Sequence, residues 1–164
     1  MNGLLIGRFQ PFHLGHLEAF QFALSKVDKL WVGIGSSNKP AQKNDPFSTE
    51  ERKEMILSST DDSMKDKISI YFIPDFDNHI QWIEKIDNIV PKFDIVFSND
   101  EFTKHLYSIR SVQVISIPFL KRDELSGTNI RNLIISDQKW DDLVPEGTKN
   151  FLINISAKER LKNL

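Results

Sequence analysis

Five short apolar runs recur along the chain, and a segment with helical spacing follows each of them. We expect strands at residues 3–7, 30–35, 68–73, 94–97 and 112–117. We expect helices at residues 14–26, 48–57, 79–90 and 100–108, from residue 126 onward, and at 145–163. Strands that alternate with helices favour an α/β fold, in which a doubly wound parallel sheet of about five strands carries helices on both faces.

Polar or glycine-containing segments follow three of these strands. Gly7 to His16 follows the first, Gly35-Ser36 the second and Ser98-Asn99 the fourth. In open parallel sheets, ligands bind outside the carboxyl ends of the strands, where the strand order reverses. We therefore expect one site at this edge of the sheet.

The segment Gly7–His16 has the sequence Gly-Arg-Phe-Gln-Pro-Phe-His-Leu-Gly-His. On a first helical turn, His13 and His16 would share one face, beside free backbone N–H groups and the positive end of the helix dipole. A lone histidine near a helix start is usually an ordinary polar residue. Here two glycines and a proline add a tight loop, so the segment favours phosphate binding. No cysteine or carboxylate has the spacing of a zinc site.

A second pattern, Ser126-Gly127-Thr128 followed by Arg131, opens a predicted helix. By itself the pattern is a weak signal, and a plain N-cap is its more usual explanation, but capping and anion binding use the same backbone donors. Arg131 lies about one turn into that helix and could reach a phosphate. The neighbouring Lys121-Arg122 pair is either a solvated surface pair or a ligand contact.

The segment Asp75–Trp82 combines an aromatic ring with polar side chains. Trp82 fits a core position, or it could stack on a base beside Asn78 and His79. The dinucleotide-binding pattern Gly-x-Gly-x-x-Gly is missing after the first strand, and so is the phosphate-loop pattern. These gaps exclude a standard dehydrogenase and a phosphate-loop ATPase.

Composition bounds the class of protein. The chain has 164 residues, 21 Lys plus Arg, 23 Asp plus Glu and a net charge of −2, which gives no general attraction to nucleic acid or anionic membranes. It has no cysteine and no apolar run of membrane-spanning length. We expect a single domain over residues 1–164 in a soluble, cytoplasmic protein.

The two outer motifs, Gly7–His16 and Leu125–Arg131, resemble the signatures of the nucleotidyltransferase superfamily that carries a His-x-Gly-His motif. With the intermediate segments, nearly the whole chain resembles the archaeal-type nicotinamide-nucleotide adenylyltransferases. The intermediate segments are Ile34–Ser37, Asn44–Arg52, Asp75–Trp82, Trp140–Pro145 and Glu159–Leu161. The resemblance implies a Rossmann-like nucleotidyltransferase domain with C-terminal helices, and a homo-oligomer, a hexamer in this family.

The reaction implied by the resemblance joins ATP and nicotinamide mononucleotide to give NAD and pyrophosphate, by direct in-line attack of the mononucleotide phosphate on the α-phosphorus. Mg²⁺ would be held mainly by substrate phosphates. The implied catalytic residues are His13, His16, Arg8 and Arg131. The implied ATP-binding residues are Gly7, Arg8, Phe9, Gln10, His13, Gly15, His16, Asn99, Arg122, Ser126, Gly127, Thr128 and Arg131. The implied mononucleotide-binding residues are Gly35, Ser36, Asn78, His79 and Trp82.

Two alternatives stay open at this point. The acceptor could be another molecule, such as phosphopantetheine or flavin mononucleotide, although Asn78 and Trp82 argue mildly against it. The chain could also be a regulatory nucleotide-binding module without catalysis, although a complete set of histidines and Arg131 argues against that. The sequence departs from the family pattern at Ser98-Asn99-Asp100 and in a shortened Asp75–Trp82 segment. Both places are where the sugar and base of the substrates would bind, so these departures bear on the identity of the acceptor more than on the adenylyl transfer.

Overall fold

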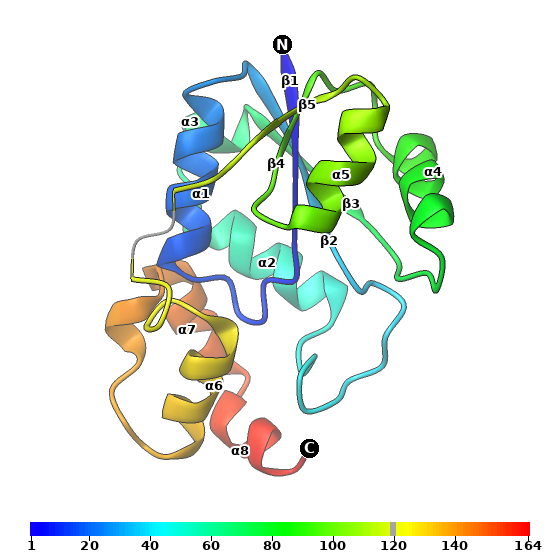
Figure 1. The fold of residues 1–164 in the computed structure, drawn as a ribbon. Coiled ribbons are helices and arrows are strands. Elements are labelled where there is room, and N and C mark those ends of the chain that lie inside the picture. The colour runs from blue at the N-terminus through cyan, green and yellow to red at the C-terminus, as the bar shows by residue number, and fades with distance from the viewer. Residues whose placement is uncertain (119–120) are drawn as a thin grey trace.

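A single twisted sheet forms the centre of the molecule. The computed structural model describes residues 1–118 and 121–164, and within them five parallel strands pair in the order β3-β2-β1-β4-β5 (Figure 1). The strands are β1 (Asn2–Gly7), β2 (Lys29–Ile34), β3 (Ile68–Phe72), β4 (Ile95–Phe97) and β5 (Gln113–Ile115). The strand order reverses at β1, which pairs with both β2 and β4. The predicted doubly wound parallel sheet is confirmed.

Helices connect the strands and extend the chain beyond the sheet. They are α1 (Leu14–Leu24), α2 (Thr49–Ser59), α3 (Asp62–Lys65), α4 (His79–Ile89), α5 (Glu101–Ile109), α6 (Gly127–Ile135), a 3₁₀ turn η1 (Asp141–Leu143), α7 (Glu146–Asn154) and α8 (Ala157–Lys162). The predicted start of α2 is confirmed, because Ser48 caps it and exchanges hydrogen bonds with Glu51. The short helix α3 was not predicted.

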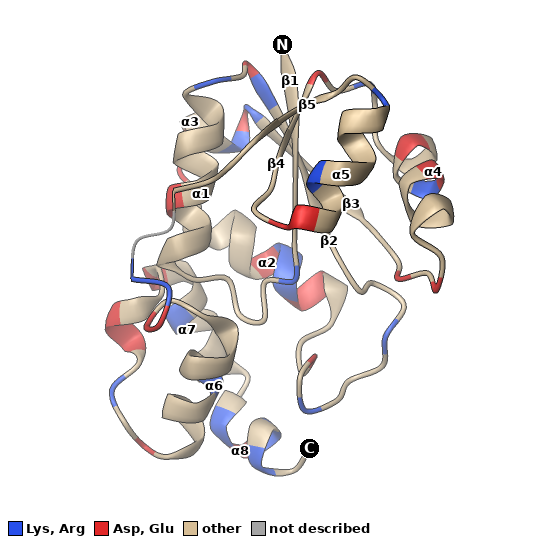
Figure 2. Cartoon of the chain, viewed as in Figure 1, with Lys and Arg blue, Asp and Glu red and all other residues tan. Residues whose placement is uncertain are grey.

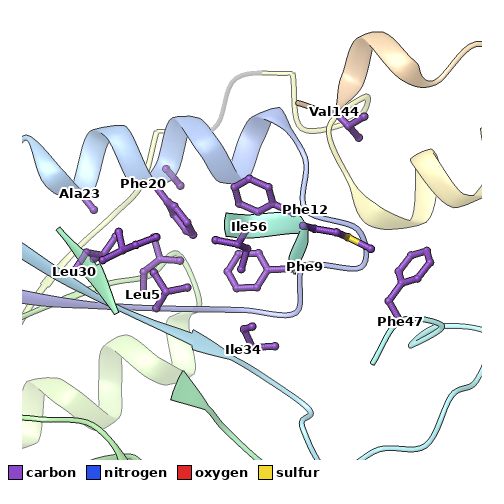
Figure 3. Close-up of a cluster of buried hydrophobic side chains, with 14 of the residues drawn as sticks. Leu5, Phe9, Phe12, Phe20, Ala23, Leu30, Ile34, Phe47, Ile56 and Val144 are labelled. Carbon is purple, nitrogen blue, oxygen red and sulfur yellow. The ribbon is translucent and has the colours of Figure 1, made fainter. Parts of the chain in front are cut away.

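The two faces of the sheet build two apolar clusters. Side chains alternate across a strand, so Leu4 and Leu5 of β1 point to opposite faces. Leu5 joins the larger cluster with residues of α1, α2 and the C-terminal helices, in which Phe9 and Phe12 of the loop after β1 contact Phe20 of α1 (Figure 3). Leu4 joins the smaller cluster with residues of α4 and α5. The sheet is therefore covered on both faces.

The C-terminal helices are joined to the rest of the fold by the packing of α7 against α2. A Cβ on Gly147 of α7 would lie 2.2 Å from the carbonyl oxygen of Ser58, so the two helices approach each other more closely than any larger residue would permit. The predicted single helix over 145–163 is wrong. The chain interrupts it at Ser156, whose left-handed backbone (φ 53°) starts α8 in a new direction. No helix in the described residues is long and apolar enough to cross a membrane.

Candidate active site

The two histidines meet at the start of α1. His13 is the N-cap, one position ahead of the predicted first turn, and its Nδ1 accepts a hydrogen bond from the backbone N–H of Gly15 at 3.1 Å. The Nδ1 of His16 accepts one from the backbone N–H of His13, also at 3.1 Å. The two rings stack with their centroids 3.7 Å apart. The prediction that they share one face is confirmed.

Both imidazoles are held neutral, with a defined tautomer. Because each Nδ1 accepts a hydrogen bond, the ring proton of each lies on Nε2, which remains as a donor. Burial lowers the pKa of His13 to about 4, and burial together with the neighbouring His13 lowers the pKa of His16 well below its usual value. At neutral pH the pair is therefore two uncharged N–H donors beside a cavity of about 270 Å³, which Arg122 and Ser126 also line.

Aromatic side chains hold the histidine rings from below. The ring of Phe9 meets His16 edge-on at 4.7 Å, and the ring of Phe12 stacks on it at 5.6 Å. Both phenylalanines are buried, and Phe9 has a left-handed backbone (φ 54°). The side chain of Phe9, predicted among the ATP contacts, therefore packs against His16 in the core.

The second motif lies directly against the first. Arg131 donates from Nη1 to the carbonyl oxygen of Gln10 at 2.6 Å, across 121 positions of sequence. A Cβ on Gly127 would come within 2.7 Å of the same carbonyl oxygen, so glycine permits this contact. Ser126 caps α6 as predicted, and Thr128 Oγ1 lies 3.4 Å from Nη2 of Arg131. The predicted meeting of the two motifs is confirmed.

Gln10 and Asn99 use their side-chain amides to hold neighbouring loops. Gln10, buried, bonds to both the N–H and the carbonyl oxygen of Phe47 at 3.0 Å each. Asn99 makes the corresponding pair of bonds with the backbone of Ile117, at 2.8 Å each. Each amide thus fixes a loop at the carboxyl edge of the sheet, a contribution that sequence reasoning did not predict.

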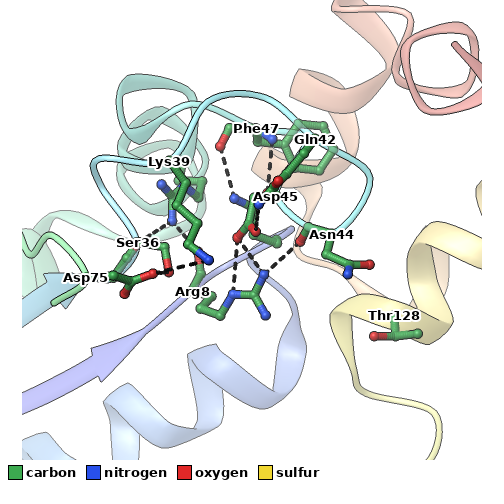
Figure 4. A network of polar contacts seen from close by, with 12 residues as sticks. Arg8, Ser36, Lys39, Gln42, Asn44, Asp45, Phe47, Asp75 and Thr128 are labelled. Carbon is green, nitrogen blue, oxygen red and sulfur yellow. Dashed lines mark hydrogen bonds and ion pairs between the residues drawn. The ribbon is translucent and has the colours of Figure 1, made fainter. Parts of the chain in front are cut away.

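Arg8, the first residue after β1, forms an ion pair with Asp45 (Figure 4). Its Nε lies 3.2 Å from Asp45 Oδ1, and its Nη2 donates to the carbonyl oxygen of Asn44 at 2.9 Å. Burial alone would raise the pKa of Asp45, but hydrogen bonds from Arg8 and Gln42 outweigh it and lower that pKa. Asp45 therefore orients a half-exposed guanidinium, and sequence reasoning did not identify it.

Arg52 is a second residue that sequence reasoning missed. Its guanidinium is 2% exposed and donates to the carbonyl oxygens of Arg8 and Gly35 at 2.8 and 2.7 Å. Burial lowers its pKa. Arg52 thereby ties together the carboxyl ends of β1 and β2. Its position three and four residues before Met55 and Ile56, on the buried face of α2, was the available signal.

The predicted mononucleotide residues lie beyond Arg8, along the ends of β2 and β3. Ser36 donates to Asp75 Oδ2 at 2.9 Å, next to Gly35, and Lys39 Nζ lies 3.6 Å from the same carboxylate (Figure 4). His79 and Trp82 line a cavity of about 430 Å³. Asn78 caps α4, since its Oδ1 accepts from the N–H of Ile80 at 2.8 Å. Asn78 is not among the residues that line this cavity, so the structure gives it a capping role.

Positive charge flanks the site on both sides. Two lysines occur in the 36–47 loop and a Lys-Arg pair occurs at 121–122, on either side of the loop that carries the histidines (Figure 2). Within residues 1–118 and 121–164, no group of three or more His, Cys, Asp and Glu side chains is arranged to hold a metal ion. The arrangement is therefore suited to binding anions with side-chain and backbone donors.

The neutral state of His13 gives a prediction about stability. Between pH 6.5 and about 4 the unfolded chain binds a proton at this residue that the folded chain excludes, so the free energy of unfolding falls as the pH falls. We expect His13 to account for about 2 kcal/mol of that loss. His13→Asn keeps a capping acceptor without a titrating ring. Urea unfolding at pH 7 and pH 4.5 should show a smaller loss in this variant, and equal losses would contradict the assignment.

Comparison with known proteins places the chain in a family. The model of the cytidylyltransferase-like family matches residues 4–133. A curated nicotinamide-nucleotide adenylyltransferase from Pyrococcus horikoshii is 37% identical over 166 residues, covering 100% of this chain and 89% of its own. One from Methanococcus aeolicus is 36% identical, covering 100% of this chain and 95% of its own.

A solved structure shares the fold. It is a bifunctional NMN adenylyltransferase/ADP ribose pyrophosphatase from Francisella tularensis, in complex with AMP and a manganese ion, with a TM-score of 0.80 and 23% identity. The match covers 99% of this chain, which spans about half of that protein's length. The chain belongs to the cytidylyltransferase-like family. Its curated relatives over the full length are nicotinamide-nucleotide adenylyltransferases.

Proposed function

We propose that the chain transfers the adenylyl group of ATP to nicotinamide mononucleotide, giving NAD and pyrophosphate. The observation that carries the proposal is a pair of cavities at the carboxyl end of β1, each lined in part by residues of the segment Gly7–His16. One is lined by His13, His16 and Ser126, and the other by Arg8 and Lys39. Two phosphate-bearing substrates can thus bind beside the same loop, as the reaction between two nucleotides requires.

The donor side supplies hydrogen bonds that suit a triphosphate. We assign the Nε2–H donors of His13 and His16, the guanidinium of Arg131 and the N-terminus of α6 to the phosphates that leave as pyrophosphate. Charge builds on those phosphates as the bond to the α-phosphorus breaks, so fixed donors stabilise the transition state more than the ground state. No nucleophilic side chain is needed, because the mononucleotide phosphate attacks directly.

The acceptor side supplies cations and an aromatic cavity. Arg8, already oriented by Asp45, is assigned to phosphates of both substrates, and Trp82 with His79 to the base of the mononucleotide. The Francisella protein is described with manganese, and a divalent cation, Mg²⁺ in our proposal, fits this chain as an ion carried by the substrate phosphates. An ion carried by the phosphates needs no metal-binding group of side chains, and none is present among the described residues.

The test is turnover of ATP and Mg²⁺ with a panel of acceptors: nicotinamide mononucleotide, nicotinic acid mononucleotide, flavin mononucleotide and phosphopantetheine. We expect NAD and pyrophosphate to form in equal amounts from the first of these. Preferred transfer to flavin mononucleotide or phosphopantetheine would replace the acceptor in the proposal. Binding of ATP without turnover of any acceptor would favour a regulatory module instead.

Trp82→Ala is expected to raise the KM for nicotinamide mononucleotide about tenfold or more and to leave the KM for ATP nearly unchanged. Stacking of a base on an aromatic ring is worth about 1–3 kcal/mol. Trp31→Ala is the matched control, because Trp31 packs in the same apolar cluster and does not line the cavity. If Trp82 is only a core residue, both variants will lose thermal stability alike and keep both KM values.

A further inference from the structure

The cavity that contains Trp82 lies between the first turns of α4 and α5. Its volume is about 430 Å³, enough for a pyridine ring with part of a ribose. Besides Trp82 it is lined by Phe76, His79 and Phe102, and by the charged residues Lys39, Asp75, Asp77 and Asp100. Three aromatic side chains of this set come from the segment after β3 or from α4, but Phe102 comes from α5.

Phe102 completes an aromatic wall of this cavity, together with Phe76, His79 and Trp82. Its ring centroid lies 4.1 Å from that of His79, with the planes at 45°. Its side chain is 47% exposed, and Phe76 beside the same cavity is 39% exposed. Neighbouring exposed aromatic side chains around one cavity mark a ligand surface more often than isolated ones do.

The charges around this cavity are mainly negative. Asp75, Asp77 and Asp100 line it together with a single lysine, Lys39, whose Nζ lies 3.6 Å from Asp75. Asp100 caps α5, because it accepts hydrogen bonds from the N–H and Oγ1 of Thr103 at 2.8 and 2.7 Å. Those bonds, and to a smaller degree His79, lower the pKa of Asp100. Asp100 is therefore an anion at neutral pH.

A second cavity of about 480 Å³ continues from the first. Lys39 and Asp75 line both, and Arg8 and Lys43 line only the second. Cations therefore outnumber the carboxylates Asp45 and Asp75 at the second cavity, which suits a phosphate, whereas the first cavity is aromatic and mainly anionic. A mononucleotide with a positively charged ring has the same order of charges.

We infer that Phe102 contacts the acceptor ring in this cavity, and that Asp77 and Asp100 select the uncharged carboxamide of nicotinamide over the carboxylate of nicotinic acid. This inference rests on the proposed function. The pyridinium ring is positive in both mononucleotides, so the aspartates attract it in both. Only the acid adds a negative charge, which the two carboxylates repel at short range.

The experiment measures kcat/KM for nicotinamide mononucleotide and for nicotinic acid mononucleotide at saturating ATP. We expect wild type to prefer the amide about tenfold or more. Asp100→Asn keeps a good capping side chain and removes the charge, so it should improve use of the acid and narrow the preference about fivefold. Phe102→Ala should raise the KM for both mononucleotides about tenfold, with the KM for ATP unchanged.

Two controls separate these effects from a general loss of structure. Ile109→Ala changes an exposed apolar residue (69% exposed) at the other end of α5 and should leave every constant unchanged. Phe102→Leu keeps apolar bulk without the aromatic face and should still raise the KM for both mononucleotides. Thermal unfolding of each variant confirms that it is folded.

The outcomes distinguish this inference from the proposed function. If folded Asp100→Asn keeps the wild-type preference for nicotinamide mononucleotide over the acid, the selection by charge is overturned. If folded Phe102→Ala keeps the wild-type KM for both mononucleotides, the contact between Phe102 and the acceptor ring is overturned. In both cases wild type would still make NAD. Failure of wild type to use either mononucleotide would instead overturn the proposed function, and this inference with it.

Discussion

His16→Ala is expected to fold and to transfer the adenylyl group about 10²–10³ times more slowly than wild type, the scale for one lost donor to developing charge. The structure gives the reason, because the hydrogen bond that Nδ1 accepts from the N–H of His13 leaves Nε2–H as the free donor. Steady-state kcat at saturating ATP and nicotinamide mononucleotide measures the loss.

Two matched variants separate the two roles of His16, which are the Nε2–H donor and the capping contact of Nδ1 with the N–H of His13. His16→Asn keeps an acceptor near the position of Nδ1 and has nothing at Nε2, so it should be as slow as His16→Ala but more stable. His16→Gln can place an N–H near the position of Nε2 and should recover part of the rate. Turnover close to wild type in folded His16→Ala would refute the assignment of His16 to the triphosphate.

The double variant His16→Ala/Arg131→Ala is expected to lose much less activity than the sum of the losses of the two single variants, each expressed as a change in activation free energy. Arg131 and the histidine loop meet at the carbonyl oxygen of Gln10, so they form one unit if they share one triphosphate. Residues that act as a unit show strongly non-additive losses. The measurement is a double-mutant cycle on kcat/KM for ATP, with thermal unfolding recorded for every variant.

Arg131→Lys tests the geometry of the same residue. The guanidinium donates to Gln10 through Nη1 and faces Thr128 with Nη2, whereas an ammonium group offers a single point of contact. We expect the lysine variant to lose most of the activity while it keeps the charge. Strict additivity in the cycle, together with full activity of Arg131→Lys, would mean that the two motifs do not act on one ligand.

The sheet was predictable because each of its strands is a short apolar run with clear boundaries. The start of α2 was predictable for a similar reason, since Ser48 and Glu51 form a local cap that needs no tertiary contact. The break at Ser156 was not predictable, because no glycine or proline marks it and a left-handed serine is chosen by packing. Periodicity alone extended one helix through it.

The candidate site divides in the same way. His13, His16 and Arg131 stand in local motifs whose spacing carries chemical meaning. Asp45 and Arg52 have their roles only through partners far away in sequence, Arg8 in the first case and the carbonyl oxygens of Arg8 and Gly35 in the second. Sequence patterns contain the first kind of information and lack the second.

The loop between Ser36 and Phe47 is attached at several points along its length. Gln10 holds the backbone of Phe47, Arg8 holds Asn44 and Asp45, and Arg160 of α8 donates to the carbonyl oxygen of Pro46 at 3.4 Å. Most surface loops tolerate insertions because their ends alone are fixed. This one has its interior fixed as well, so a single added residue would displace Asp45 or Phe47 from its partner. In evolutionary terms, we expect its length to be kept while its exposed side chains drift.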